Sequence, residues 1–576
     1  MELEGTVDLE QFQPFIEKYS SKERDSLLPM LHDAQKIYGW LPREVQQAIG
    51  QTLRVPLAEI HGVIEFYSMF YNHPTARRVI RICEDPACYL SGGDEIAKAF
   101  QEKLELLPGE TNSELTLSYE QVPCLGLCDH GPAALVDGRL TGEIKHDVIG
   151  DLVSGNIPET QEKVFGTHRI ITEGIGSLNP LRFQDYADSG GFEVLRGSLS
   201  KDPEEIIDII EECGILGRGG AMFPLGRKWR FTRAARGQEI DKYIVVNGDE
   251  SEPGTFKDRY LMEGDPFAIV EAATIAGYAV GASKGWIFVR GEYPQSYRRL
   301  KNAVEESRKS GFLGRNILGS GFGFEIELRL GAGAYICGEE TALFSAIEGF
   351  RGFPKVKPPF PVTHGLFDKP TAVNNVETLV TALKVLKIGK TEWQKHGTEQ
   401  SPGTKLFCVS GNINKPGLYE HPFGVTVQQV IDMAGGVKGG RTTKAVLLGG
   451  AAGSFIGPAD FDLSLTYEDT RSRNLSLGSG VVMVFNETVD LRKIFFQLGR
   501  FFAHESCGKC FPCQLGTKRQ LEILESIGNG KVSNQTYKRD LIDIGFAMTQ
   551  TSLCGLGQTA ASAMLSAIRL WPELFE

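Results

Sequence analysis

The cysteines are the residues of this sequence best suited to chemistry, and eight of the 11 fall into two groups of four. In the first group, Cys83-x4-Cys88 is followed by Cys124-x3-Cys128. Two pairs of thiolates suit a [2Fe–2S] cluster, because each iron takes one pair. Zinc is the alternative for any four-cysteine site, but structural zinc sites usually have more closely spaced pairs. The spacing therefore favours an iron–sulfur cluster.

The second group is Cys507-x2-Cys510-x2-Cys513 with the distant partner Cys554. Three cysteines at three-residue spacing plus one remote cysteine are typical of a [4Fe–4S] cluster, because one loop or helix start can hold three corners of the cube. Close-spaced cysteines in a long chain without a secretory signal are metal ligands rather than disulfides. The other cysteines are isolated, and we expect them to pack in the interior: Cys213, Cys337 and Cys408.

Three glycine-rich segments lie in the middle of the chain: GRGGAMFP at 217–224, NGDESEP at 247–253 and GAGAYICGEET at 331–341. Glycines let a backbone approach a flat ring or a phosphate group. Asn374 and Asn375 open a helix-like stretch, so a phosphate could lie at that helix N-terminus. None of the segments follows a clean dinucleotide-binding pattern, and tight turns in an α/β domain remain the alternative for each one alone.

Composition limits the class of protein. At ~150 residues per domain, 576 residues predict roughly four domains. The net charge of -12 argues against binding to nucleic acid or to an anionic membrane. The acidic start MELEGTVDLE is no secretory or mitochondrial signal, and the longest apolar run, 272–283, is too short to cross a membrane. We therefore expect a cytoplasmic protein without direct membrane insertion.

Hydrophobic periodicity predicts the elements that position these residues. Residues 1–75 are expected to be helical, and residues 78–83 form a β-branched strand just before the first cysteine pair. Asp137-Gly138 indicates a hairpin. A polar linker follows, and then a large glycine-rich α/β region, short strands over 404–485 and a helical end.

Together these motifs resemble a known family. Residues 25–155, with both cysteine pairs complete, resemble the small [2Fe–2S] subunit of NADH-oxidising complexes. Residues 200–576 resemble the flavoprotein subunit that binds FMN and NADH in respiratory complex I and in soluble diaphorases. The fusion in this order is similar to the flavin subunit of NAD-reducing nickel–iron hydrogenases.

The resemblance implies an α/β multidomain fold. It implies a helical bundle (1–75), a thioredoxin-like [2Fe–2S] domain (76–158), a linker (159–199), an FMN- and NADH-binding α/β domain (200–400), a small ubiquitin-like β-grasp domain (401–488) and a helical [4Fe–4S] domain (489–576).

The resemblance also implies site residues. Eight cysteines are the expected metal ligands: Cys83, Cys88, Cys124, Cys128, Cys507, Cys510, Cys513 and Cys554. The expected FMN-binding residues are Gly217, Arg218, Gly219, Gly220, Lys228, Asn247, Asp249, Glu250, Tyr335, Gly338, Glu339, Glu340, Asn374, Asn375 and Thr378. The expected NADH-binding residues are Phe223, Phe231, Glu252, Lys357 and Phe360. Two positions depart from the family pattern: Met222 stands where glycine is usual, and Leu225 where a small polar residue is usual.

The implied function is that of an NADH:acceptor oxidoreductase, or diaphorase, subunit. Hydride passes between NAD(H) and FMN with no catalytic side chain, and single electrons leave through one [2Fe–2S] and one [4Fe–4S] cluster to a partner subunit. We expect the partner to be an NAD-reducing [NiFe] hydrogenase. The alternatives are the same module in a formate dehydrogenase, complex I or an electron-bifurcating complex. From other classes of protein, a non-catalytic cluster-binding scaffold and a zinc-stabilised interaction protein remain.

Overall fold

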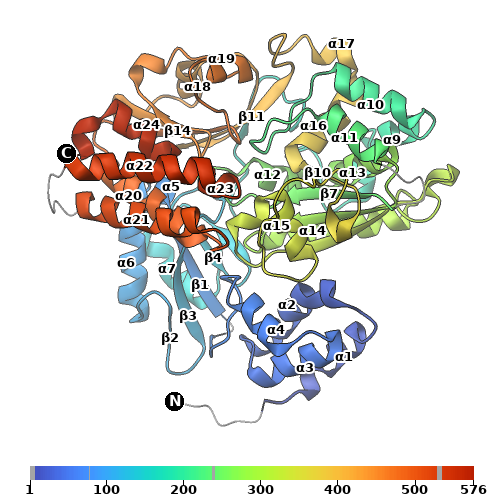
Figure 1. Ribbon diagram of the computed structural model, residues 1–576, viewed down its shortest axis with the longest axis horizontal. Coiled ribbons are helices and arrows are strands. Elements are labelled where there is room, and N and C mark those ends of the chain that lie inside the picture. Colours follow the sequence, from blue (N-terminus) through green and yellow to red (C-terminus); the bar gives the residue numbers. More distant parts are fainter. Residues whose placement is uncertain (1–6, 77, 236–240, 529–534, 576) are drawn as a thin grey trace.

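A computed structural model describes residues 7–76, 78–235, 241–528 and 535–575. The beginning and the last residue of the expected helical ends, 1–6 and 576, lie outside the described residues, as do 529–534. Three sheets and the helices around them form the α/β multidomain fold that the sequence predicts, and this prediction is confirmed (Figure 1). Among the described residues, no helix is both long and apolar enough to cross a membrane.

The N-terminal region is a helical bundle. Its helices are α1 (Gln13–Tyr19), α2 (Leu27–Tyr38), α3 (Arg43–Leu53) and α4 (Leu57–Ile64). Pro42 and Pro56 directly precede α3 and α4, where a missing backbone N–H costs no helical hydrogen bond. Leu31, Val45 and Ile49 are fully buried between the helices, as the apolar spacing predicts.

The next domain contains the first cysteine group. Its five-stranded sheet has the order β2-β3-β1-β4-β5. The strands are β1 (Arg78–Cys83), β2 (Glu110–Thr111), β3 (Leu117–Val122), β4 (Ala134–Val136) and β5 (Arg139–Thr141), with helices α5 (Pro86–Tyr89), α6 (Gly93–Leu104) and α7 (Ile149–Ser154). Asp137 and Gly138 both have positive φ between the paired strands β4 and β5. The predicted hairpin is therefore present.

The range expected to be a linker contains structure of its own: β6 (Val164–Phe165), α8 (Phe183–Asp188) and α9 (Glu193–Ser198). Strand β6 pairs in parallel with a strand of the β-grasp domain. The buried carboxylate of Glu420 accepts hydrogen bonds from the backbone N–H groups of Ile170, Ile171 and Thr172 at 2.8–2.9 Å. It also accepts from the hydroxyls of Thr172 and Thr404, both at 2.7 Å. This one side chain fixes the segment to the β-grasp domain.

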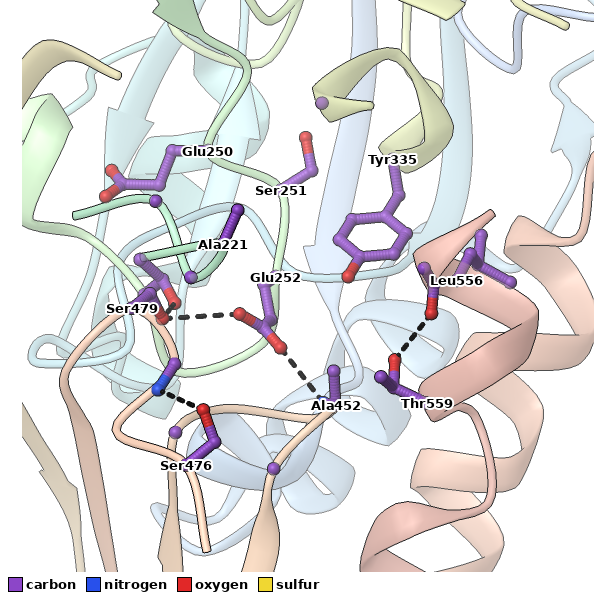
Figure 2. Close-up of a pocket in the computed structure, with 18 of the residues that line it drawn as sticks. Ala221, Glu250, Ser251, Glu252, Tyr335, Ala452, Ser476, Ser479, Leu556 and Thr559 are labelled. Atoms are coloured by element: carbon purple, nitrogen blue, oxygen red, sulfur yellow. Dashed lines mark hydrogen bonds between the residues drawn. The ribbon is translucent and has the colours of Figure 1, made fainter. Parts of the chain in front are cut away.

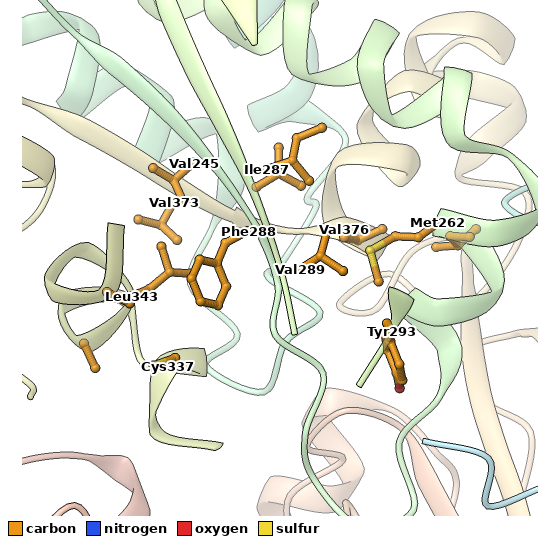
Figure 3. Packing of buried hydrophobic residues seen from close by; sticks show 14 of the residues in the cluster. Val245, Met262, Ile287, Phe288, Val289, Tyr293, Cys337, Leu343, Val373 and Val376 are labelled. Atoms are coloured by element: carbon orange, nitrogen blue, oxygen red, sulfur yellow. The ribbon is translucent and has the colours of Figure 1, made fainter. Parts of the chain in front are cut away.

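The glycine-rich domain has four parallel strands in the order β10-β7-β8-β9. They are β7 (Tyr243–Gly248), β8 (Lys284–Val289), β9 (Glu325–Leu330) and β10 (Thr371–Asn375), with helices α10 (Pro203–Glu212), α11 (Leu225–Ala234), α12 (Lys257–Gly264), α13 (Pro266–Val280), α14 (Pro294–Lys309), α15 (Glu340–Ile347), α16 (Val376–Ile388) and α17 (Lys390–Trp393). Figure 3 shows Phe288 packed toward Leu343 and Cys337, and Val289 toward Val376 and Tyr293. Both faces of the sheet are therefore buried, as parallel sheets require.

The β-grasp domain forms most of the third sheet, which has the order β14-β13-β15-β11-β12-β6. Its strands are β11 (Thr404–Gly411), β12 (Gly417–Pro422), β13 (Thr443–Leu448), β14 (Ser454–Ile456) and β15 (Val481–Asn486), with helices α18 (Val427–Met433) and α19 (Tyr467–Ser472). The C-terminal helices are α20 (Leu491–Glu505), α21 (Phe511–Gly528), α22 (Gln535–Thr551), α23 (Gly555–Thr559) and α24 (Ser562–Leu570).

The buried contacts of Glu420 lead to a stability prediction. Glu420→Ala leaves several donors without an acceptor, so we expect the free energy of unfolding to fall by about 3 kcal/mol. The exposed Glu399→Ala serves as the control. Thermal unfolding and limited proteolysis of residues 159–199 measure the effect. Equal melting temperatures and equal proteolysis for the two variants would contradict this anchoring role.

Candidate functional site

Two adjoining cavities lie where the parallel strands of the glycine-rich domain end. The first, of about 650 Å³, has Phe223, Phe231 and Phe360 in its wall, and we call it the aromatic cavity. The second, of about 660 Å³, is lined by Ser251, Ser479, Thr559 and other hydroxyl residues, and we call it the hydroxyl cavity (Figure 2). The two share wall residues: Gly219, Ala221, Asn247, Gly338, Glu339, Asn375 and Gly555. Ligands of parallel α/β sheets bind at this edge.

The structure brings together nearly all the residues expected to bind FMN or NADH. Those that line the aromatic cavity are Gly217, Gly219, Phe223, Lys228, Phe231, Asn247, Gly338, Glu339, Glu340, Lys357, Phe360, Asn374, Asn375 and Thr378. Those that line the hydroxyl cavity and not the aromatic one are Gly220, Asp249, Glu250, Glu252 and Tyr335. Arg218 lines neither cavity.

Arg218 points into a buried group of charges. Its Nη1 lies 3.2 Å from Glu377 Oε1, and its backbone N–H donates to Thr378 Oγ1 at 2.9 Å. Glu377 also meets Lys405 Nζ at 2.7 Å and Lys257 Nζ at 3.1 Å. Burial alone would raise the pKa of Glu377, but Lys405, Lys257 and then Arg218 lower it to about 2. The side chain of Arg218 therefore anchors the first glycine-rich segment to the buried charges.

Glycine is required at two places in the cavity wall. Gly219 lies against Asn375, where a Cβ would approach the Asn375 Cβ to 3.2 Å. Gly220 has φ +106°, a backbone conformation that only glycine adopts readily, and an added Cβ would have no atom closer than 3.9 Å. The bare backbone therefore leaves open space along the cavity wall.

Two features of the wall suit a bound phosphorylated ring. Asn375 caps the N-terminus of α16, and its side chain donates to Asp258 at 2.6 Å. The ammonium of Lys228 lies nearby, bonded to the Val373 carbonyl at 2.7 Å, and burial lowers the pKa of this lysine. Asp249 Oδ2 is buried and has no hydrogen-bond partner among the described residues. A helix N-terminus with a lysine suits a phosphate, and a buried unpaired acceptor suits a ligand N–H.

Two glutamates connect the cavity wall to other elements. Glu250 accepts hydrogen bonds from the backbone N–H groups of Asp258 and Arg259, at 2.8 and 3.0 Å, where α12 begins. Burial, followed by the Asp258 charge, raises the pKa of Glu250. Glu252 accepts from Ala452 N at 2.9 Å and from Ser479 Oγ at 3.2 Å, across the boundary with the β-grasp domain (Figure 2). Burial raises the pKa of Glu252 to about 7.

Sequence reasoning missed one wall of the hydroxyl cavity. This wall comes from loops of the β-grasp domain and from the C-terminal helices, and it includes Gly449, Ala452, Gly453, Ser454, Asn474, Leu475, Ser476, Gly478, Ser479, Leu556, Thr559 and Ser562. The available signals were the glycines directly after β13 and directly before β15. They mark close backbone approaches, but nothing in the sequence says what they approach.

The four cysteines of the first group lie together in the interior. Cys124 Sγ is 3.3 Å from Cys128 Sγ, and all four thiols are buried. The neighbouring thiols of Cys124 and Cys88, followed by burial, raise the pKa of Cys83 well above the usual range. The Gly126 backbone N–H donates to Cys124 Sγ at 3.4 Å. Small residues in this loop therefore let a backbone amide reach a ligand sulfur.

The loop that carries Cys124 and Cys128 is docked on the wall of the hydroxyl cavity. Arg290 donates to the Cys124 carbonyl at 2.7 Å and to the Glu250 carbonyl at 2.6 Å. Arg259 Nε donates to the Gly126 carbonyl at 3.0 Å. Gly126 has no room for a side chain, since a Cβ there would lie 2.0 Å from the hydroxyl of Tyr293. The first cysteine group is thus held directly behind Glu250.

The four cysteines of the second group line a small cavity of their own. Helix α21 begins directly after Cys510, and Cys554 directly precedes α23. Helix N-termini favour negative charge, so both helix starts suit a cluster held by thiolates. Ile336 and Leu556 line this small cavity and the hydroxyl cavity alike. Among the described residues, these two side chains alone are shared by both walls.

Among the described residues, no three or more His, Cys, Asp or Glu side chains converge closely enough to hold a single metal ion. The assignment of two polynuclear clusters therefore rests on the cysteine spacing, on the proximity of the cysteines within each group and on the family matches below. The isolated Cys213, Cys337 and Cys408 are buried and free, as expected of packing residues.

The two departures from the family pattern are explained differently. Met222 has φ +54°, a conformation that favours glycine, and its side chain packs on the β-grasp core and lines neither cavity. Leu225 is buried at the start of α11 and lines the aromatic cavity. At Met222 an unfavourable backbone conformation is therefore combined with favourable packing of the side chain on the β-grasp core. Leu225 makes one wall of the aromatic cavity apolar.

Four parts of the chain match known families. The matches are to the Nuo51 FMN-binding domain over 210–384, the thioredoxin-like [2Fe-2S] ferredoxin over 12–156, the iron-sulfur binding region of NADH-ubiquinone oxidoreductase-F over 493–576 and the SLBB domain over 406–453. The SLBB match falls on the domain expected to be a β-grasp.

Relatives match over much longer stretches. The NAD-reducing hydrogenase HoxS subunit alpha of Cupriavidus necator is 34% identical over 97% of this chain and 93% of its own length. An NADH-quinone oxidoreductase subunit of Aquifex aeolicus is 42% identical over 68% of this chain and 90% of its own length. A crystal structure of an NAD+-reducing [NiFe]-hydrogenase in the H2-reduced state contains a chain with TM-score 0.85 and 31% identity, covering 96% of this chain and 92% of that one.

The raised pKa of Glu252 leads to a prediction for protein depleted of flavin. A glutamate in the unfolded chain has a pKa of about 4.3, so the carboxyl group of Glu252 binds its proton more tightly in the folded chain than in the unfolded one. The bound proton therefore stabilises the fold at low pH, and this stabilisation is lost as the pH rises from about 4.3 through 7. The loss amounts to about 4 kcal/mol. We expect Glu252→Gln to reduce the fall in melting temperature between about pH 5 and pH 8. Glu399→Gln should behave as wild type, and parallel pH profiles for all three proteins would rule the effect out.

Proposed function

The chain belongs to the family of fused [2Fe–2S] and FMN/NADH-binding flavoprotein subunits of complex I and NAD-reducing hydrogenases, and on this premise we propose that it is the diaphorase subunit of an NAD-reducing [NiFe] hydrogenase. In this role it is an NADH:acceptor oxidoreductase that works reversibly and passes single electrons to a partner subunit. The observation that carries the proposal is the shared wall of Ile336 and Leu556, which connects the flavin-sized cavity to the second cysteine group.

The aromatic cavity is the proposed entry for NADH. Phe223, Phe231 and Phe360 are 42%, 49% and 55% exposed, which is unusual for phenylalanine and leaves their rings free to stack on adenine. Lys357 bridges Glu339 at 2.8 Å and Glu340 at 2.6 Å. Carboxylates beside the adenosine ribose favour NADH, because they would repel the additional phosphate of NADPH.

FMN is proposed to lie where the two cavities meet. The N-terminus of α16 with Asn375 and Lys228 would hold its phosphate, and the unpaired Asp249 Oδ2 would accept a hydrogen bond from a ring N–H. When bound, FMN supplies the conversion between a two-electron hydride and single electrons. The protein contributes orientation and exclusion of water, and no side chain has to act as acid or base.

The second cysteine group is the proposed exit for electrons. Cys507, Cys510 and Cys554 are partly exposed, so a partner can come close to their cluster. Phe511 and Leu515, at the start of α21 beside these ligands, are 75% and 60% exposed. Apolar side chains this exposed fit a contact surface for another subunit of the complex.

The cytoplasm is the location that we propose. All 11 cysteines are free, and eight of them are the proposed cluster ligands. Such thiols persist in a reducing compartment.

One substitution can test whether flavin reduction depends on the cavities while electron transfer to the partner depends on the second cysteine group. We expect Cys510→Ala to abolish electron transfer to the partner and to leave the bleaching of the flavin by NADH nearly intact, because Cys510 lines only the small cavity. Stopped-flow absorption measures the first step, and NADH-driven reduction of the partner measures the second. Cys213→Ala is the matched control, since this buried cysteine lies in neither group. Loss of flavin bleaching with FMN still bound would count against the proposal.

The identity of the partner can be tested by metal analysis of the complex that co-purifies with this chain under anaerobic conditions. We expect nickel together with iron. Molybdenum or tungsten would instead indicate a formate dehydrogenase. Iron alone would indicate complex I or a bifurcating complex, and either result would overturn the assignment to a [NiFe] hydrogenase.

A further inference from the structure

A third cavity, of about 380 Å³, lies where the [2Fe–2S] domain, strand β6 and the β-grasp domain meet, and we call it the junction cavity. Its lining includes Cys128, two carboxylates, Asp129 and Glu143, and three lysines, Lys163, Lys415 and Lys438. It shares no residue with the aromatic or the hydroxyl cavity. One wall is held by the pairing of β6 with β12, in which Phe165 lies opposite Tyr419. It is therefore a separate site, formed only when the three parts are assembled.

The junction cavity carries an excess of positive charge. Lys163 Nζ is paired with Glu143 at 2.6 Å and donates to the Asp129 carbonyl at 3.0 Å. Lys415 and Lys438 are solvent-exposed at the mouth of the cavity, and their side chains have no hydrogen bond or ion pair in the part of the chain that the structure describes. Burial, followed by the Lys163 charge, lowers the pKa of Lys438.

The carboxylate of Asp129 lines the cavity but also contacts His130, at 3.1 Å, and the glycine-rich domain. Its Oδ2 accepts from the Tyr260 hydroxyl at 2.6 Å, and its Oδ1 lies 3.5 Å from Arg259. Arg259 and Tyr260 of the glycine-rich domain therefore stabilise the negative charge of Asp129. Among the lining residues, Glu143 and Asp129 oppose three lysines, which leaves one net positive charge in a chain whose net charge is -12. A local cationic site in an acidic protein attracts an anion.

We propose that the junction cavity binds a phosphate-bearing anion, and that its occupancy is linked to the redox state of the [2Fe–2S] cluster. Flexible lysines act as point charges that suit the several oxygens of a phosphate group. A water molecule takes only about 30 Å³, so the cavity has room for a pyrophosphate group or more. Phe165 offers an apolar surface beside the lysines. The source of the phosphate is either free pyrophosphate or a nucleotide.

The link to the cluster follows from the position of Cys128, which is a proposed cluster ligand and also lines the junction cavity. A cluster held by four thiolates is negatively charged, and one-electron reduction adds a further negative charge. An anion beside Cys128 therefore binds the oxidised protein more tightly, and by reciprocity it makes the cluster harder to reduce. A tenfold preference for the oxidised protein corresponds to a midpoint potential lower by about 59 mV.

Binding is tested on the purified holoenzyme by calorimetry with inorganic pyrophosphate. A second titration uses ADP in the presence of saturating NAD+, which blocks the aromatic cavity. We expect Lys415→Ala/Lys438→Ala to weaken binding by roughly tenfold or more and Lys415→Arg/Lys438→Arg to retain it. The matched control is Arg441→Ala/Arg471→Ala, which removes the same charge from exposed positions of the β-grasp domain. Tighter binding of ADP than of pyrophosphate identifies a nucleotide site, and the reverse order identifies a pyrophosphate site. No binding, or equal losses in the alanine and control variants, would overturn the proposal.

The redox link is tested by potentiometric titration of the [2Fe–2S] electron paramagnetic resonance signal with and without pyrophosphate. We expect a shift to lower potential in the wild type and in the control variant, and none in Lys415→Ala/Lys438→Ala. Binding without any shift would overturn the link. This inference does not depend on the proposed function except through the [2Fe–2S] cluster. Failure of the proposed function would appear instead as a wild-type flavin that NADH does not bleach.

Discussion

The buried carboxylate of Glu377 is the interaction on which the arrangement of the site depends. It is inaccessible to solvent and meets cations from three separate segments: Arg218 of the first glycine-rich segment, Lys257 of α12 and Lys405 of the β-grasp strand β11. Breaking a buried ion pair by removing one partner typically costs about 3–5 kcal/mol, because the remaining charge stays buried and unpaired. This requirement keeps the three segments at the N-terminus of α16, and the two main cavities exist because the segments meet there.

A second set of buried charges connects the cavities to the first cluster. Arg290 donates to the carbonyls of both Cys124 and Glu250, so the cluster loop and the cavity wall share one side chain. On the other side, Ile336 and Leu556 separate the hydroxyl cavity from the second cysteine group. The hydroxyl cavity is thus connected to the first cysteine group through Arg290 and to the second through Ile336 and Leu556. The fold achieves this by packing four domains around one sheet edge.

Local patterns predicted local structure well. The hairpin at Asp137-Gly138, the helix that begins after Asn375 and the strand before Cys83 are all present, because each depends on neighbours in sequence. The departure at Met222 shows the limit of this reasoning. Its positive φ explains why glycine is usual there, yet the direction of its side chain into the β-grasp core depends on a domain more than 180 residues away.

The sequence by itself determined the family and the cofactor types and predicted the cluster ligands, because cysteine spacing constrains cluster geometry through covalent connections along the chain. Only the tertiary structure decided that Arg218 faces inward, that β-grasp loops close the hydroxyl cavity and that three lysines meet beside Cys128. These arrangements join residues far apart in sequence. Their energies come from burial and charge pairing between packed domains, and no periodicity along the chain records which surfaces will meet.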